Sequence, residues 1–185
     1  MIIVISGPSG VGKSTVVSRL LETMEGIDRS ISVTTRKLRG DESDGVEYFF
    51  TSREDFVKIR DEGKLLEWAE VHGNLYGTSE EFVDGRLGEG RSVLLEIDVQ
   101  GGMKVKARKP ESMLIFIMPP SFEELEERLR GRETDDDEVI RQRLANANRE
   151  LGYSSKYDYR VVNGDLDECV GEIRDIITSG SGVGR

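Results

Sequence analysis

Apolar residues form short, nearly continuous runs along the chain, and helix-like patterns separate these runs. The most apolar runs are Ile2–Ser6, 93–98, Met113–Met118 and Tyr159–Val162. Such runs are typical of parallel strands that helices cover on both faces. Their alternation with helical patterns predicts a doubly wound α/β fold. We expect a fifth strand through 30–34, which gives a three-layer core around a five-stranded parallel sheet.

A different pattern occupies the stretch from about residue 35 to 85. Its apolar runs, 46–50 and 64–71, are shorter and more polar, and they flank a helical pattern over 53–62. This change in pattern predicts an α+β subdomain inserted into the core.

Three pairs of residues have the spacing of a capping box, in which a side chain caps the first turn of a helix. The pairs are Ser52/Asp55, Ser121/Glu124 and Thr134/Asp137. The second and third predict two helices joined by the polar link 131–133. We expect this helical hairpin to act as a lid.

The chain of 185 residues has the length of a single domain with a well-developed core. Within it we assign 1–31, 86–120 and 146–180 to the core, 32–85 to the insert, 121–145 to the lid, and 181–185 to a tail that we expect to be disordered.

Composition excludes several classes of partner. The net charge of −10 argues against a nucleic-acid polymer. No apolar stretch approaches the roughly 20 residues that span a bilayer, so we expect no membrane insertion. The first apolar run starts at the initiator Met with no signal-peptide pattern, and we expect a cytoplasmic protein. Cys169 lies on an apolar helical face and is expected to be a buried thiol.

The sequence GPSGVGKS follows the first apolar run and precedes a helical pattern over 15–24, which is the context of a P-loop. Its backbone N–H groups are expected to wrap a phosphate, with Lys13 bridging the β and γ phosphates and Ser14 binding Mg²⁺. The predicted ATP-binding residues of this loop are Gly7, Pro8, Ser9, Gly10, Val11, Gly12, Lys13, Ser14 and Thr15.

Two carboxylates, Glu96 and Asp98, end the apolar run 93–98. They lie two residues apart and project from the same strand face. The last residue of the run reaches the crevice where open α/β sheets bind ligands, so Asp98 is the predicted second metal-site residue beside Ser14. The alternative that Asp98 caps the following helix stays open.

Phosphoryl transfer depends on charge compensation, which makes arginines candidates for catalysis. Arg36 and Arg39 lie three apart in TTRKLRG, and Arg132 and Arg143 lie on the predicted lid. The predicted catalytic residues are Lys13, Arg36, Arg132 and Arg143. Other lid arginines, such as Arg128, alternate with glutamates as on an ordinary solvated helix face.

Five stretches together resemble guanylate kinases over nearly the whole chain: SVTTRKLRGDESDGVEYFF, LLEWAEVHGNLYGT, LLEIDVQG, RLRGRETDDDEVIRQRL and YDYRVVNGDLDE. The resemblance implies a P-loop core, a GMP-binding insert and a lid that close over ATP and GMP. It implies phosphoryl transfer from MgATP to GMP, giving GDP and ADP and supporting guanine nucleotide supply. Use of dGMP and the oligomeric state stay open.

The resemblance also implies individual roles. It places the acceptor phosphate on Arg36, Arg39, Tyr48 and Tyr76, and guanine on Ser32, Glu67 and Thr78. Asp98 lies near guanine or in the water shell of magnesium, two roles that the sequence does not divide. At the donor side, Arg132 and Arg143 contact the ATP phosphates and Asn163 approaches the adenine.

Two other functions fit the same scaffold. A related kinase would phosphorylate a sugar bisphosphate precursor, but it needs no base-reading carboxylate such as Glu67. A phosphopeptide-binding module without catalysis would have a degraded P-loop, whereas this one is intact. The chain departs from the guanylate kinase pattern at Leu38, Asp41, Glu133 and Gly164, where we expect altered constants and retained activity.

Overall fold

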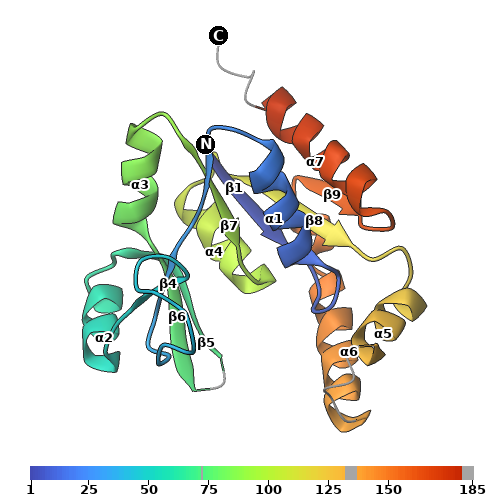
Figure 1. The fold of residues 1–185 in the computed structure, drawn as a ribbon, viewed down its shortest axis with the longest axis horizontal. Helices are drawn as coiled ribbons and strands as arrows, with labels where there is room; N and C mark the ends of the chain where they lie inside the picture. Colours follow the sequence, from blue (N-terminus) through green and yellow to red (C-terminus); the bar gives the residue numbers. More distant parts are fainter. Residues whose placement is uncertain (72, 132–136, 181–185) are drawn as a thin grey trace.

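The computed structural model describes residues 1–71, 73–131 and 137–180. A five-stranded parallel sheet in the order β2-β7-β1-β8-β9 forms its centre (Figure 1). The strands are β1 (Ile2–Ser6), β2 (Ile27–Arg29), β7 (Ser92–Glu96), β8 (Met113–Met118) and β9 (Tyr159–Val162). The predicted α/β core is therefore confirmed.

Helices cover both faces of this sheet because successive strand residues point in opposite directions. Ile3 and Ile5 of β1 pack on one face, whereas Ile2 and Val4 pack on the other. On the first face lie α1 (Lys13–Thr23) and α7 (Leu166–Gly180), and on the second lie α3 (Glu80–Gly88) and α4 (Val99–Arg108). This two-sided burial explains why the core strands are continuously apolar.

The fifth strand of the core sheet is β2, and the prediction of a core strand through 30–34 was wrong. Ile27 packs with the core cluster, and the Ser30 N–H still donates to Leu94 O at 2.8 Å. The chain then leaves the core, and Val33 packs in a separate cluster with Phe56. The chain passes from one sheet to the other between the short strands β2 and β3, and the apolar pattern alone does not show where this change occurs.

The insert is a four-stranded sheet in the order β4-β3-β6-β5 with one helix against it. Its elements are β3 (Ser32–Thr34), β4 (Tyr48–Phe50), α2 (Arg53–Asp61), β5 (Leu65–Val71) and β6 (Asn74–Ser79). The predicted cap of α2 is confirmed, since Ser52 Oγ accepts from the Asp55 N–H at 3.0 Å. The sequence analysis did not predict strand β6 or helix α3.

Two helices, α5 (Phe122–Arg130) and α6 (Asp137–Leu151), occupy the place of the predicted lid. Ser121 Oγ caps α5 as expected, accepting from the Glu124 N–H at 3.0 Å. The third predicted capping residue, Thr134, lies outside the described residues, as do 132–133 of the link and the tail 181–185. After α6 a short 3₁₀ turn (Ser154–Lys156) leads into β9.

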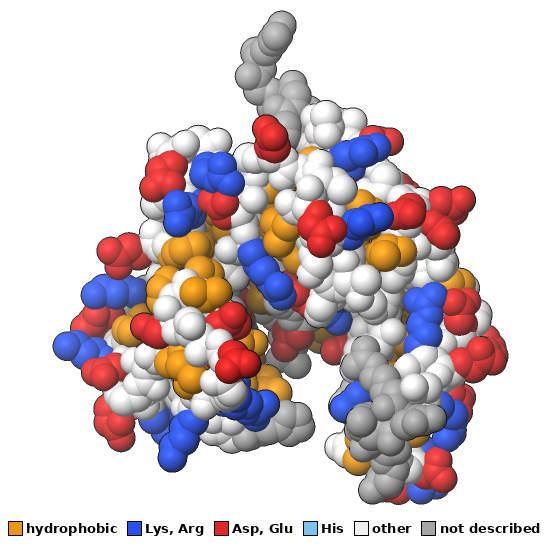
Figure 2. Space-filling view, in the orientation of Figure 1, with side chains coloured by type: hydrophobic (Ala, Val, Ile, Leu, Met, Phe, Trp, Pro, Cys, Tyr) orange, Lys and Arg blue, Asp and Glu red, His pale blue; other side chains and the backbone are white. Residues whose placement is uncertain are grey.

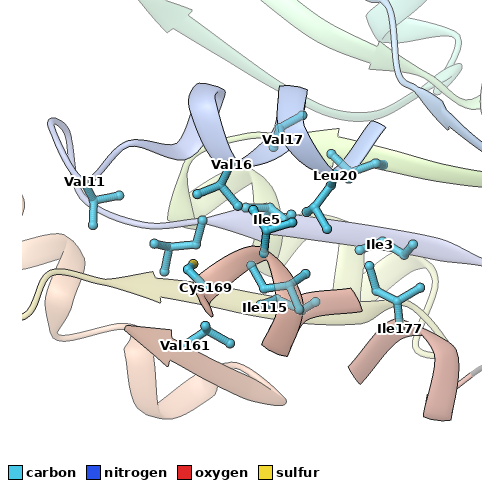
Figure 3. Packing of buried hydrophobic residues seen from close by; sticks show 14 of the residues in the cluster. Ile3, Ile5, Val11, Val16, Val17, Leu20, Ile115, Val161, Cys169 and Ile177 are labelled. Atoms are coloured by element: carbon cyan, nitrogen blue, oxygen red, sulfur yellow. The ribbon is translucent and has the colours of Figure 1, made fainter. Parts of the chain in front are cut away.

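The apolar core on the α1/α7 face extends into the middle of the P-loop. Figure 3 shows Val11 at the loop end of a row that continues through Val16, Ile5 and Ile115. Cys169 lies within this row and is buried, as predicted, and burial raises the pKa of its thiol to about 11. The loop is thus tied to a rigid core by its own side chain.

The insert and the α5/α6 pair extend from the core on either side of the same end of the molecule (Figure 1). Figure 2 shows the surface hollowed between them. Among the helices in the described part of the chain, none is long and apolar enough to cross a membrane.

Candidate active site

The P-loop connects β1 to α1, and its geometry depends on glycine. Gly12 caps α1 with φ of 93°, a left-handed conformation that side chains rarely adopt. A Cβ at this position would lie 2.7 Å from Asn163 Nδ2. Lys13 Nζ donates to Gly7 O at 2.6 Å and to Pro8 O at 3.2 Å, so the lysine folds back across the loop. The N–H groups at the start of α1 are the expected anion site.

The side chain of Asn163 is hydrogen-bonded to the P-loop backbone. Its Nδ2 donates to Val11 O at 2.7 Å, while its own N–H donates to Met118 O at 2.8 Å. The backbone carbonyl of Asn163 accepts from Arg128 Nη2 at 3.0 Å. Arg128 is therefore more than the solvated residue that its sequence neighbours indicated, because it links α5 to the segment after β9. The predicted approach of Asn163 to adenine stays a prediction.

Glu150 is a residue near the loop that the sequence analysis did not select. Its Oε2 accepts from the Ser9 N–H at 3.2 Å, and burial raises the pKa of its carboxyl group, with Lys13 acting in the opposite direction. It lies at the end of a polar helix, where nothing in the pattern separates it from solvated glutamates. Only the packing of α6 against the loop reveals it.

At the carboxyl end of β7, the carboxylate that contacts Ser14 is Glu96, whereas the sequence analysis selected Asp98. Asp98 caps α4, accepting from the Gly101 N–H at 2.7 Å through Oδ1, as the open alternative described. Glu96 instead faces the P-loop, since Ser14 Oγ donates to its Oε1 at 2.5 Å. The metal and guanine roles assigned to Asp98 stay predictions.

Ser14 and Glu96 offer a hydroxyl and a carboxylate oxygen, the hard donors that Mg²⁺ prefers. Among the described residues no group of three or more His, Cys, Asp or Glu side chains could hold a metal. A site with few protein ligands is nevertheless usual for Mg²⁺ in kinases, where nucleotide phosphates and waters complete the shell. The residues present therefore fit the predicted ion.

Register places four predicted acceptor residues in one row across the insert sheet. Ser32 of β3 lies opposite Tyr48 of β4 and Thr78 of β6, and Thr78 lies opposite Glu67 of β5. Tyr76 lies two residues before Thr78 and so points to the same face. Its ring lies 5.9 Å from that of Tyr48, between centroids. These residues are dispersed in sequence and adjacent in the fold.

Glu67 is the buried carboxylate of this row. Only 7% of the residue is exposed, and its Oε1 accepts from Thr78 Oγ1 at 2.7 Å. Burial raises the pKa of the Glu67 carboxyl group, the Thr78 hydrogen bond opposes this shift, and the charge of Asp98 adds to it. A buried carboxylate with one partner retains acceptor capacity for a ligand.

Arg36 is fixed before any ligand arrives. Its Nη1 and Nη2 donate to the two oxygens of Glu42 at 3.0 and 2.6 Å, and Nη1 also donates to Lys37 O at 2.9 Å. The guanidinium lies 5.2 Å from the centroid of the Tyr48 ring. The Glu42 hydrogen bonds raise the pKa of Arg36 and lower that of Glu42. Glu42 is a second site residue that the sequence analysis missed.

A pocket of about 510 Å³ connects the insert to the P-loop. Five residues show its extent: Ser14 and Glu96 at the core end, and Ser32, Tyr48 and Thr78 at the insert end. The pocket therefore joins the predicted metal-binding residue Ser14 to three of the predicted acceptor-side residues.

Of the remaining predicted residues, Arg39 and Arg143 are not among those that line this pocket. Arg39 is exposed, and its N–H donates to Glu42. Arg143 is half-buried on α6, and Arg132 lies outside the described residues. Of the departures from the family pattern, Leu38, Asp41 and Gly164 are exposed, and Glu133 lies outside the described residues.

Replacement of the buried carboxylate by an amide tests the raised pKa of Glu67. Folding favours the protonated form of Glu67, because its pKa is higher in the folded than in the unfolded protein. The stability that this preference contributes is complete below the unfolded pKa of about 4.5 and is lost as pH rises through the folded pKa. We therefore expect Glu67→Gln to raise the Tm at pH 7.5 and to raise it less near pH 4.5. Thermal melting across this range measures the difference, and an equal effect at both pH values would contradict a raised pKa.

Comparison with known proteins identifies the family to which this chain is similar. The family model described as guanylate kinase matches residues 1–180. The chain belongs to the guanylate kinase family. This confirms the resemblance seen in the sequence and the expected enzyme class, a phosphotransferase.

Individual guanylate kinases resemble the chain over most of its length. A guanylate kinase from Caldanaerobacter subterraneus subsp. tengcongensis is 50% identical over 177 residues, covering 96% of this chain and 86% of that protein. One from Fusobacterium nucleatum is also 50% identical over 177 residues, covering 96% and 95%. The crystal structure of guanylate kinase from Anaplasma phagocytophilum superposes with a TM-score of 0.76 at 38% identity, covering 97% of this chain and 85% of that one.

Proposed function

We propose that this guanylate kinase transfers the γ-phosphoryl group of MgATP to GMP, giving ADP and GDP and contributing to guanine nucleotide supply. The observation that carries the proposal is the buried carboxylate of Glu67, which accepts from Thr78, because Thr78 lines the pocket that reaches Ser14 of the P-loop. Guanine presents N1–H and an N2 amino group side by side, which one carboxylate accepts together. A carboxylate on the acceptor side and a P-loop on the donor side favour a guanine nucleotide and a nucleoside triphosphate.

Separate groups of residues would bind the donor and the acceptor phosphates. The P-loop N–H groups and Lys13 bind the donor phosphates, and Arg36, Arg39, Tyr48 and Tyr76 bind the acceptor phosphate. Arg132 and Arg143 come from the lid. Phosphoryl transfer needs positioning and charge compensation more than covalent chemistry, so these cations supply most of the catalysis.

Mg²⁺, when bound with ATP, neutralises charge on the donor phosphates. Ser14 would hold it, with a carboxylate from the end of β7. Arg36 needs little reorganisation to accept a phosphate, because Glu42 and Lys37 O use three of its five N–H donors and leave two available.

The direct test measures ADP release with GMP, dGMP, AMP, UMP and ribose phosphates as acceptors at saturating MgATP. The proposal expects kcat/KM to be highest for GMP by orders of magnitude over AMP. Preference for a sugar phosphate would favour the related sugar-phosphate kinase. Absence of turnover with every acceptor, together with phosphopeptide binding, would favour the non-catalytic module.

Closure of the insert and the lid is expected when both substrates bind, because residues from separate segments must meet at one phosphoryl group while water is excluded. Small-angle scattering should show a smaller radius of gyration with a bisubstrate analogue than without it. ATP alone is the control and should give a smaller change. An unchanged radius with an analogue shown to bind would exclude a moving lid.

A further inference from the structure

Arg29 is a cation at the candidate site that no sequence motif accounts for. It ends β2, which pairs in parallel with β7 so that Arg29 lies opposite Leu94. Parallel strands end at the same edge of a sheet, so Arg29 arrives beside Glu96, two residues further along β7. Strand pairing thus fixes its backbone at the edge where β1 enters the P-loop.

The Glu96 carboxylate is shared between two donors, one at the end of β2 and one in the first turn of α1. Arg29 Nη2 donates to Oε2 at 2.6 Å, and Ser14 Oγ donates to Oε1 at 2.5 Å. The Glu96 side chain is 14% exposed and that of Arg29 is 51% exposed. All three residues line the pocket between the P-loop and the insert. Both oxygens of a carboxylate suited to Mg²⁺ are therefore engaged.

We propose that Arg29 is the counter-ion of Glu96 and limits how tightly the Ser14–Glu96 pair binds a divalent cation without nucleotide. The inference rests on the proposed function, because it takes this pair as the metal site. A guanidinium cannot lose its proton at physiological pH, so it opposes a second cation at the same carboxylate. The divalent ion then enters with a nucleotide, whose phosphates supply additional negative charge.

Two effects of removing Arg29 oppose each other. Loss of the hydrogen bond to Oε2 frees the carboxylate to rotate, which weakens metal binding. Loss of the positive charge removes repulsion, which strengthens it. Ser14 still orients Oε1 after the change, so the electrostatic effect is the larger one. Because Arg29 is half exposed, solvent and salt screen this effect, and it should reach only about fivefold.

The test is Mn²⁺ binding to the nucleotide-free protein, followed by the electron paramagnetic resonance signal of free Mn²⁺. Arg29→Met should bind Mn²⁺ about fivefold more tightly than the parent protein, and Arg29→Lys, which keeps the charge, within about twofold of it. Arg53→Met is a matched control. Arg53 is 54% exposed and pairs with Glu70 at 3.4 Å, so its replacement makes the same charge change away from the P-loop and should leave binding unchanged.

Arg29→Met binding that is equal to or weaker than that of the parent protein, including binding undetectable in both, would overturn the proposal. Glu96→Gln should weaken Mn²⁺ binding, and an unchanged value would place the ion elsewhere and also overturn it. Thermal melting checks the fold, with Arg29→Gln as the second variant if the methionine variant is unstable. The acceptor assay with the parent protein tests the proposed function separately, so the two failures are distinguishable.

Discussion

Lys13→Ala is expected to lower kcat for phosphoryl transfer by at least about two orders of magnitude while leaving the fold intact. The lysine lies at the first turn of α1, with its ammonium group over the loop that would hold the β and γ phosphates. A charge placed there stabilises the transferring group in a site with little water. Alanine removes that charge. No other side chain of the loop GPSGVGKS is positively charged, so none can replace it.

The stability of the variant decides how this result is interpreted. Lys13 donates to two loop carbonyls, Gly7 O and Pro8 O, which solvent can satisfy in the variant. We therefore expect a Tm close to that of the parent protein. Lys37→Ala, which removes an exposed lysine next to Arg36, is the matched control and should keep most of the activity. A Lys13→Ala kcat above about a tenth of the parent value would contradict the P-loop assignment.

Glu67→Ala is expected to lower kcat/KM for GMP by at least about tenfold and to reduce the preference for GMP over AMP. Charge-assisted hydrogen bonds contribute about 1.5 to 3 kcal/mol each, and guanine would make two with this carboxylate. Adenine presents an acceptor at N1, so AMP offers no donor there to the buried carboxylate, which keeps only its hydrogen bond from Thr78. Sites of this kind reject the wrong ligand by about 10⁴-fold.

The measurement is kcat/KM for GMP and for AMP at saturating MgATP, with folding checked by thermal melting. Glu70→Ala is the matched control, because Glu70 lies three residues further along β5, is exposed, and pairs with Arg53. It should leave the GMP-to-AMP ratio unchanged. A ratio for Glu67→Ala within about threefold of the parent value would show that another residue reads the base, with Ser32, Thr78 and Asp98 as candidates.

The residues around the nucleotide pocket show where sequence reasoning stops. Ser14 and Glu67 could be selected from the sequence because each belongs to a stretch with a recognisable pattern, and in the structure Ser14 lines the pocket while Glu67 contacts Thr78, which lines it. Glu42 and Glu150 were missed, although both contact predicted ligand-binding segments. Each is one glutamate among many in an acidic chain, and its role depends on which backbone or side chain faces it. That information lies in packing between distant segments.

The sequence by itself predicted the strand-helix alternation, the P-loop and the inserted subdomain, because these features depend on local periodicity and on residue types at short spacing, which the chain carries in any conformation. The family followed from the resemblance of five stretches to guanylate kinases. Tertiary structure alone decided that β2 is the fifth core strand, that Glu96 faces Ser14 while Asp98 caps α4, and that Arg29 reaches Glu96. The physical reason is that strand register and side-chain direction at the sheet edge follow from long-range pairing. Residues 67 positions apart, as Arg29 and Glu96 are, meet only after β2 has paired with β7.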